Sequence, residues 1–568
     1  MKKVIALLLV AAMSLSMAAC GGSKANNDGN NNANADSGSF DVAACVYSEP
    51  HCIDPSVSDG DDQSYYLIHM YEGLMKYKQT DQKAGDRDGC YLMTVDKGQA
   101  ESYDVSEDGL TYTFHLRNDI YWSDGQPVTA KDFVFSWQRL VDPQTASNNG
   151  GLFNYIIKNA YDIQQGTKDK TELGVEATDD KTFVVHLENA CPYFLDLCAS
   201  SSALPERQDI VEQYGNEWTE AKNVVCNGGY KMTEWVHDSY LKLVKNDKYY
   251  DYSNLGPDSI TWYLSDNETS MLSAYKSGDY DFIAMMPADQ VKPLKESGDL
   301  MINGKVGLYY LYLNVNQIPD WRVRAAITLA IDRDNIVTNV AQGGEKVATG
   351  TVTAGITDCN GDLWIDKVGD VKYKWLQEQY PDYDLTKYED CCELAKKLLD
   401  EAVAAGYDVN KTLDYQYNTS DTNKAIGEAI QSDVQSVLGI SLTLNNTDSS
   451  SYCENLSQGG FSIARLGNSV PYDDPIGYLG FFGKEGSYNY SEWTDDKFDS
   501  LVLQAKTMAD GEERDNVMKQ AEERMYQEGG FAVCPLYYYV NKACLNPSID
   551  NVGYVTLGFY SFMYAKQK

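Results

Sequence analysis

Residues 101–143 read ESYDVSEDGLTYTFHLRNDIYWSDGQPVTAKDFVFSWQRLVDP. Within this stretch, hydrophobic and polar residues alternate over residues 111–117. Tyr112, Phe114 and Leu116 fall on one face of an extended chain, and polar residues fall on the other. Such alternation predicts a strand with one buried face.

A turn and a capped helix follow the predicted strand. Ser123, Asp124 and Gly125 are typical of a tight turn. Thr129 can cap a helix whose third residue, Asp132, completes the capping box. One helical stripe then carries large hydrophobic side chains: Phe133, Trp137 and Leu140. The strand, turn and helix form one unit, and nothing in it calls for catalysis.

The first 39 residues predict export and anchoring rather than a folded domain. Two lysines precede a short apolar run, residues 4–10, which is too short for a transmembrane helix. We predict a lipoprotein signal peptide over 1–19, because a cysteine directly after small residues resembles a bacterial lipobox, in which Cys20 is acylated. A secretory signal with an incidental cysteine is the alternative. The polar residues that follow predict a flexible tether over 20–39.

Length and composition bound the rest of the chain. It has 568 residues, of which 43% are hydrophobic and 12% aromatic, as is typical of a well-packed protein with two or more domains. Its formal net charge is −37, because 84 acidic residues outnumber 47 Lys and Arg. A polyanion of this size is poorly suited to bind nucleic acid, so we expect no nucleic-acid partner.

The chain has thirteen cysteines, and the sequence does not decide whether they form disulfides or remain free thiols. With Cys20 acylated, an even number remains, which permits disulfides outside the cytoplasm. We favour mostly free, buried thiols, with a disulfide framework as the alternative. The sequence has no CxxC pair and only five His, so the ligand spacing of a zinc site is absent. We expect neither a metal nor another cofactor.

Sequence motifs of common enzyme classes are missing from the chain, which has no HExxH, GxSxG or P-loop pattern. Two acidic pairs, Asp473–Asp474 and Glu522–Glu523, could serve a glycosidase, whose chemistry needs two carboxylates at a suitable separation. Such pairs are expected by chance in a chain with 84 acids. We therefore expect a protein that is not an enzyme, and a carboxylate-dependent surface hydrolase is the interpretation from a different class.

Several further motifs follow one another along residues 40–568 in the order of a known family. They are EPHCIDP at 49–55, YEGL at 71–74, NGGY at 227–230, SGDYD at 277–281, WRVRAAITLAIDRD at 321–334, YNTSD at 417–421 and PLYYYVN at 535–541. Together with residues 101–143, they resemble the peptide and nickel class of bacterial extracellular solute-binding proteins, the receptors of ABC importers. Several long motifs in register make the resemblance specific.

The resemblance implies an α/β fold of the two-lobed, periplasmic-binding-protein-like type, with an extra domain inserted in the first lobe. The expected divisions are 40–76, 205–304 and 537–568 for the first lobe, 77–204 for the inserted domain and 305–536 for the second lobe. It also implies capture of extracellular oligopeptides in a cleft that closes by hinge motion, and delivery to an ABC permease with its ATPase. We expect a monomer held on the outer face of the cell membrane by a lipid on Cys20.

In peptide receptors of this class, the ligand lies between the lobes as an extra strand, and opposite charges hold its termini. By resemblance, the second lobe contributes 461–475, FSIARLGNSVPYDDP, and the first contributes the loop 58–64, SDGDDQS. The ligand-binding residues implied are Arg465, Gly467, Asn468, Ser469, Tyr472, Asp59, Asp61, Asp62, Asn149 and Ser449. Arg465 matches an arginine that can hold a carboxylate, with a structural ion pair as the alternative.

The sequence departs from the peptide-receptor pattern at several of these positions. Pro471 stands where oligopeptide receptors carry the acid that pairs with the ligand's α-ammonium, and proline offers no charge. Asn468 and Ser449 stand where Trp is usual, and Asn149 replaces an aromatic residue, which predicts a roomier and wetter pocket. We hypothesise that the three acids within residues 59–62 supply the lost counter-charge; a solvated turn is the alternative.

The ligand class has an alternative on the same scaffold. The 43 tyrosines could stack on sugar rings, although most tyrosines in proteins occupy core and sheet positions. An oligosaccharide, a modified peptide or a metal chelate is therefore the alternative to an oligopeptide.

Overall fold

The computed structural model describes residues 39–568, apart from residues 47–48, 51, 59–60, 86, 471, 485 and 487. Six positions named above lie outside this description, wholly or by their side chains: Cys20, Asp59, Asp61, Asp62, Ser449 and Pro471. Among the helices of the described residues, none combines the length and the hydrophobicity needed to cross a membrane.

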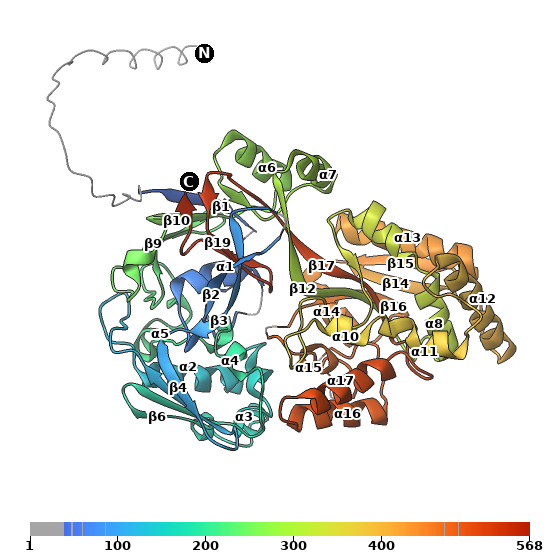
Figure 1. Cartoon of the computed structure of the whole chain (residues 1–568), viewed down its shortest axis with the longest axis horizontal. Helices are drawn as coiled ribbons and strands as arrows, with labels where there is room; N and C mark the ends of the chain where they lie inside the picture. The colour runs from blue at the N-terminus through green and yellow to red at the C-terminus, as the bar shows by residue number, and fades with distance from the viewer. Residues whose placement is uncertain are drawn as a thin grey trace, which may run out of the picture. The chain divides into compact units, whose positions relative to one another are not determined.

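One eleven-stranded sheet runs through the described chain (Figure 1). Its order is β15-β14-β16-β12-β17-β11-β1-β10-β9-β8, and β13 pairs with β17 beside this path. The strands are β1 (Asp41–Cys45), β8 (Tyr230–Val236), β9 (Tyr240–Lys245), β10 (Ser259–Tyr263), β11 (Phe282–Ile283), β12 (Leu300–Leu313), β13 (Lys346–Val347), β14 (Leu413–Asn418), β15 (Leu442–Thr447), β16 (Ile463–Asn468) and β17 (Val533–Leu545). Because strands from distant parts of the chain are neighbours, the sheet depends on long-range pairing.

Strands β12 and β17 are long, with 14 and 13 residues, and pair with each other in antiparallel orientation. The ladder runs from Leu300 opposite Cys544 to Tyr312 opposite Val533. Its register shifts within residues 304–308, so an irregularity interrupts the pairing near the middle. The ladder therefore has two parts, which pack into different hydrophobic clusters.

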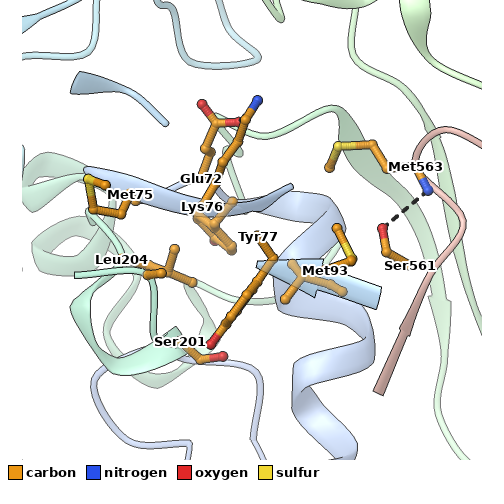
Figure 2. Close-up of a pocket in the computed structure, with 13 residues that line it drawn as sticks. Glu72, Met75, Lys76, Tyr77, Met93, Ser201, Leu204, Ser561 and Met563 are labelled. Carbon is orange, nitrogen blue, oxygen red and sulfur yellow. Dashed lines mark hydrogen bonds and ion pairs between the residues drawn. The ribbon is translucent and has the colours of Figure 1, made fainter. Parts of the chain in front are cut away.

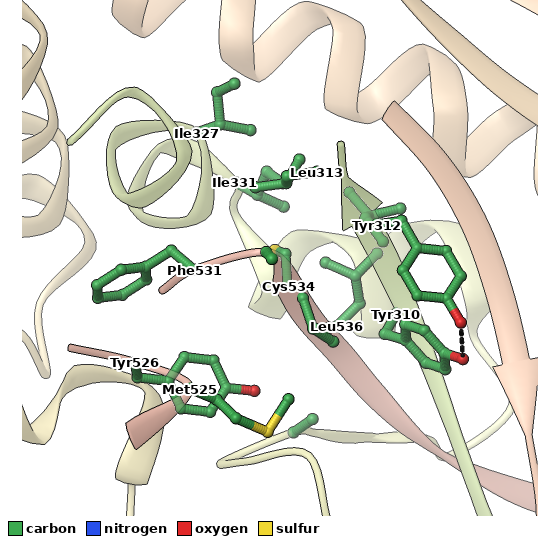
Figure 3. Packing of buried hydrophobic residues seen from close by; sticks show 14 of the residues in the cluster. Tyr310, Tyr312, Leu313, Ile327, Ile331, Met525, Tyr526, Phe531, Cys534 and Leu536 are labelled. Atoms are coloured by element: carbon green, nitrogen blue, oxygen red, sulfur yellow. Dashed lines mark hydrogen bonds between the residues drawn. The ribbon is translucent and has the colours of Figure 1, made fainter. Parts of the chain in front are cut away.

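Buried hydrophobic side chains form two large clusters that divide at this irregularity. One cluster draws its members from residues 306–538, and the other draws from residues 42–301 and 543–565. Figure 3 shows part of the first cluster, where side chains of β12 and β17 meet those of helix α8 (Trp321–Ala330). The two strands thus belong to both cores and connect them.

Amphipathic helices cover the cluster of residues 306–538. They include α8, α11 (Val371–Gln379), α12 (Tyr388–Ala404), α13 (Asp421–Leu438), α16 (Asp496–Thr507) and α17 (Glu512–Arg524). In α12 the buried positions Leu394, Leu398 and Ala402 recur every four residues, as expected of a helix with one apolar face.

The stretch 101–143 folds as its sequence predicts. Strand β5 spans Thr111–Leu116, and helix α2 spans Ala130–Val141 with Thr129 as its N-cap. The Thr129 N–H donates to Asp132 Oδ2 at 2.8 Å, and the predicted stripe of Phe133, Trp137 and Leu140 is fully buried. The sheet beside α2 has the order β4 (Ala100–Val105), β5, β7 (Thr182–His186) and β6 (Val175–Asp179).

A third sheet joins the early chain to its end. Its order is β2 (Met75–Lys83), β3 (Cys90–Lys97), β19 (Val552–Val555) and β20 (Phe559–Ser561). Strand β19 pairs in parallel with β3, and β20 packs against helix α1 (Asp61–Met70). The last residues of the chain therefore complete the core that its first strands begin.

Eight cysteines of the described residues are buried free thiols. Burial raises the pKa of the Cys45 and Cys544 thiols to about 12. A thiol with so high a pKa is a poor nucleophile at neutral pH, so these two cysteines act as small hydrophobic side chains.

A buried ionic network attaches helix α2 to the segment before α1. Arg139 of α2 pairs with Asp54 at 2.6 Å and with Glu206 at 2.9 Å. The indole N–H of Trp218 donates to Asp54 Oδ2 at 2.9 Å. Asp54 and Glu206 are at most 5% exposed, and burial raises the pKa of Glu206 to about 8. The guanidinium therefore neutralises the negative charge that remains on this buried carboxyl pair.

Replacing Arg139 by methionine roughly keeps the side chain's volume but removes the counter-charge of the buried carboxyl pair, Asp54 and Glu206. We expect the free energy of unfolding in urea to fall by about 3–5 kcal/mol at neutral pH. The loss should be smaller at acidic pH, because protonation removes the unpaired carboxylate charge, and burial already raises the pKa of Glu206 to about 8.

The matched control is Lys131→Met, because Lys131 pairs with Asp180 on the surface, where both side chains are more than two-thirds exposed. That variant should lose less than about 1 kcal/mol. Equal losses in the two variants would show that the buried network has no special role.

Candidate functional site

Strand β16 carries three of the predicted ligand-binding residues: Arg465, Gly467 and Asn468. It pairs antiparallel with β12, which places Leu311 opposite Arg465 and Tyr309 opposite Gly467. Its other edge pairs in parallel with β14 at Ile463 and Ala464, the first two residues of β16. Strand β16 is therefore flanked by β12 and, at its start, by β14. Strand β12 continues into the other hydrophobic cluster.

Arg465 is a cation that the described residues do not neutralise. Its Nη1 donates to Asn418 Oδ1 at 2.6 Å, and its Nη2 donates to the Tyr539 hydroxyl at 3.1 Å. The guanidinium lies 4.5 Å from the ring centroid of Tyr309. In the described part of the chain, Arg465 has only tyrosines as its largest electrostatic partners, and its Nε–H is buried without a hydrogen-bond partner.

Tyrosines form the walls around this guanidinium. The rings of Tyr309 and Tyr537 stack with centroids 4.8 Å apart, and Tyr539 meets both rings edge-on. Burial raises the pKa of Tyr309 and Tyr537 above the ordinary value, so these hydroxyls stay neutral. Neutral dipoles and ring faces hold the cation in place but leave its charge available to an anion. The site is therefore complementary to a carboxylate, which an arginine fork can bind with two hydrogen bonds.

Gly467 makes room for Tyr539. A Cβ at this position would collide with the Tyr539 hydroxyl and lie 2.9 Å from a ring carbon. Gly307 on β12 approaches the same ring, since its Cβ would also lie 2.9 Å from Tyr539. Two glycines on neighbouring strands thus seat the ring that bonds to Arg465.

Asn468 and Ser469 follow at the end of β16. The Asn468 amide donates to the Tyr310 hydroxyl at 2.9 Å, and Tyr310 and Tyr312 share a hydrogen bond of 2.9 Å. The asparagine amide therefore continues a chain of polar contacts into the core. Ser469 is half-buried one residue beyond the strand.

Five other predicted ligand positions lie on separate elements. The Asn149 amide donates to the Ser58 carbonyl at 2.9 Å and to the Ser202 hydroxyl at 3.1 Å, so both its hydrogens are used within the protein. Tyr472 stacks on Tyr193, with ring centroids 4.0 Å apart. Helix α1 begins with Asp61 and Asp62, and helix α14 (Ser449–Ser457) begins with Ser449.

The sequence motifs contained the partners of Arg465 without revealing their role. Asn418 lies in YNTSD, and Tyr539 lies in PLYYYVN. The hydrogen bonds to Arg465 span 47 and 74 residues, so neither partner is signalled by local periodicity. Of the tyrosine run in the second motif, Tyr537 and Tyr538 are only 3% exposed and belong to the core.

The two acidic pairs considered for a hydrolase are occupied by protein partners. Asp474 pairs with Arg514 at 2.6 Å, and Asp473 accepts hydrogen bonds from Thr357. Glu522 accepts three N–H groups, and Glu523 pairs with Lys374 at 2.6 Å. Each carboxylate therefore has a structural role, which disfavours a catalytic pair.

A pocket lies in the other hydrophobic cluster, between α1, β2 and the chain near η4 (Ser201–Ala203) (Figure 2). It encloses about 470 Å³, part of which is open to solvent, and Met75, Met93 and Met563 lie around it. A Glu72–Lys76 ion pair of 3.2 Å stands at its edge. None of the predicted ligand-binding residues lines this pocket.

Comparison with known families and curated proteins gives a consistent match. A family model described as "Bacterial extracellular solute-binding proteins, family 5 Middle" matches residues 94–490. The periplasmic oligopeptide-binding protein OppA of Salmonella typhimurium is 33% identical over 508 residues, 88% of this chain and 87% of that protein. The oligopeptide-binding protein OppA of Bacillus subtilis is 28% identical over 560 residues, 97% and 96% of the two chains.

Solved structures agree in fold. The chain superposes on Haemophilus influenzae OppA in complex with the peptide RPPGFSPFR with a TM-score of 0.75 and 27% identity, covering 93% of this chain and 99% of that one. The murein tripeptide-binding protein MppA of Escherichia coli gives the same TM-score and identity, with coverage of 93% and 98%.

Replacing Gly467 by alanine should displace Tyr539 from Arg465. We expect the free energy of unfolding to fall by about 1–3 kcal/mol, because a methyl group is forced into a filled site. A crystal structure of the variant should show the Tyr539–Arg465 hydrogen bond broken. The matched control is Gly460→Ala, three residues before β16, where a Cβ has no neighbour within 4 Å. If Gly467→Ala were as stable as this control, the tight seat of Tyr539 would be refuted.

Proposed function

Because this chain belongs to family 5 of the bacterial extracellular solute-binding proteins, we propose that it captures oligopeptides outside the cell and delivers them to an ABC permease and its ATPase. It shares the two-lobed α/β fold of the periplasmic peptide-binding proteins. Its task is binding and release, with no bond made or broken, and it acts as a monomer.

The observation that carries the peptide proposal is the unneutralised Arg465. Arg465 is half-buried, and a guanidinium shielded from water without an acidic partner costs stability. The described residues supply only neutral acceptors and ring faces. A peptide carboxylate would supply the missing charge and take up the unused N–H groups. Main-chain hydrogen bonds along β16 would then hold the peptide without reading its side chains.

The proposed lobes follow the two hydrophobic clusters. We assign residues 40–76, 205–304 and 537–568 to the first lobe, 77–204 to its inserted domain and 305–536 to the second lobe. The division between the clusters at residues 301–306 supports the boundary at 304. The other division, at residues 538–543, lies just beyond the boundary at 537, because Tyr537 and Tyr538 belong to the second-lobe cluster. Strands β12 and β17 run from one cluster into the other at this division. We therefore place the hinge at the irregularity of their ladder.

The ligand's amino terminus is proposed to matter less than its carboxyl terminus. Pro471 stands where an acid is expected, and the next two acids, Asp473 and Asp474, already have protein partners. Asp61 and Asp62, at the start of α1, are proposed to meet a cationic group of the ligand on the first-lobe side.

We also propose that Cys20 carries a lipid that holds the protein at the outer face of the cell membrane. The support is the sequence: an apolar run, small residues and a cysteine, followed by a polar tether.

A panel of peptides with free or blocked ends tests the ligand proposal by calorimetry. For the wild type, amidating the carboxyl terminus should weaken binding about 10- to 100-fold, because a charge-assisted hydrogen bond is lost. Acetylating the amino terminus should weaken it less. In Arg465→Gln, free and amidated peptides should bind alike.

Arg322→Gln is the matched control, because Arg322 pairs with Asp320 at the start of α8. This variant should bind every peptide of the panel as the wild type does. In a D61N/D62N variant, only peptides with a cationic group should bind less tightly. Equal binding of free and amidated peptides to the wild type would exclude Arg465 as the carboxylate site. Absence of binding by every peptide would refute the peptide proposal.

Replacing Cys20 by serine should release the protein from the membrane of its host. The wild type should incorporate labelled fatty acid and partition into detergent, whereas Cys20→Ser should do neither, because serine has no thiol to acylate. Cys359→Ser, which removes a partly exposed thiol of the folded body, serves as the control. Labelling of Cys20→Ser would contradict lipidation at this position.

A further inference from the structure

A tyrosine stack connects the two hydrophobic clusters outside the β12–β17 ladder. Tyr193 directly precedes helix α4 (Phe194–Leu197), and Tyr472 lies four residues after β16. Their rings are 4.0 Å apart and inclined by only 9°. Both residues pack against both large clusters. In Figure 1, α4 and α15 (Ile476–Leu479) mark the two sides of this contact.

A hydrogen bond lies beside the stack. The Asp473 N–H donates to Asp196 Oδ2 at 3.2 Å. On the second-lobe side, the Asp473 carboxylate is fixed by the N–H and hydroxyl of Thr357, at 2.6 and 2.7 Å. The contact therefore joins α4 to a segment that the second lobe already holds in place.

The second lobe is shaped to present Tyr472. A Cβ at Gly477 would lie 3.0 Å from the Tyr472 ring, so a larger residue there would push the ring out of position. Asp474, two residues after Tyr472, is held by Arg514 through two hydrogen bonds of 2.6 and 2.9 Å. Burial raises the pKa of Tyr193 and Tyr472, so both rings remain neutral.

We propose that Tyr193 and Asp196 on one side, and Tyr472 and Asp473 on the other, form a latch that holds the two lobes in the closed form. The idea rests on the proposed function, because a latch has a purpose only in a receptor that opens and closes. The four residues set the balance between the open and closed forms and thereby the affinity for any ligand.

The carboxylate of Asp196 makes the latch sensitive to pH. Burial, followed by repulsion from Asp473 and Asp474, raises its pKa to about 6, while the Asp473 N–H acts in the opposite direction. Two further groups interact with it and are neutral, because burial raises the pKa of each: Tyr77 of β2 and Cys198 next to α4.

The sign of the effect follows from where the proton is bound. When the lobes separate, Asp196 returns to water and to its ordinary pKa, so closing takes up a proton. The closed form is therefore favoured as the pH falls through about 6. Above that pH, the charge on Asp196 opposes closing.

Small-angle X-ray scattering of the full, ligand-free protein tests the latch at about pH 5 and about pH 7.5. The wild type should be more compact at the lower pH. Tyr193→Ala should be more open at both pH values, because the stack is lost. Asp196→Asn should be as compact at the higher pH as the wild type is at the lower one, because the amide oxygen still accepts the Asp473 N–H without a charge.

Affinity for one peptide of the panel should move in the same directions. At the higher pH, Asp196→Asn should bind about three- to tenfold more tightly than the wild type, and Tyr193→Ala more weakly. Tyr193→Phe keeps the ring and should match the wild type, which guards against a folding defect in the alanine variant.

Tyr161→Ala is the matched control for the stack. Tyr155 and Tyr161 also stack, with centroids 4.8 Å apart, but both are exposed on the surface. Asp180→Asn, an exposed acid, is the control for Asp196. Neither control should change the scattering.

Scattering that does not change with pH, or that is the same for the wild type and Tyr193→Ala, would overturn the latch. So would an unaltered pH dependence in Asp196→Asn. Because scattering is measured without ligand, the latch can fail while peptides still bind, and it can hold if the peptide proposal fails.

Discussion

The pairing of β12 with β17 is the interaction on which the rest of the structure depends. The two strands run through both hydrophobic clusters, and an irregularity in their register separates the two parts. Their residues also build the candidate site, because Tyr309 and Gly307 come from β12 and Tyr539 comes from β17. Strands β12 and β17 therefore both connect the two cores and form a wall of the candidate site.

This arrangement links ligand binding to the geometry of the lobes. Arg465 is bonded to Tyr539, whose ring is seated by glycines on β12 and β16. A change in the geometry of the β12–β17 ladder would move the Tyr539 ring relative to β16. The tyrosine stack at α4 joins the two clusters at a second place. In the proposed latch, the β12–β17 ladder persists and this second contact opens.

The sequence predicts local structure well and long-range contacts poorly, for physical reasons. The strand and capped helix within 101–143 follow from periodicity and capping, which act over a few residues. Arg465 was found through resemblance, but its partners Asn418 and Tyr539 lie 47 and 74 residues away. Asn149 was predicted to face a ligand, yet its amide hydrogens bind Ser58 and Ser202, because only the folded chain shows which acceptors come near.

The excess of acidic residues in the chain makes the absence of an acidic partner for Arg465 significant. Acidic residues outnumber Lys and Arg by 84 to 47, so a buried arginine does not lack partners through any scarcity of acids. Arg139 and Arg514, which are also largely buried, each pair with carboxylates. Arg465 is instead surrounded by tyrosines and an asparagine, groups that orient a guanidinium and leave its charge in place. In a polyanionic protein, such an uncompensated cation is most simply explained by an anionic ligand that arrives from outside.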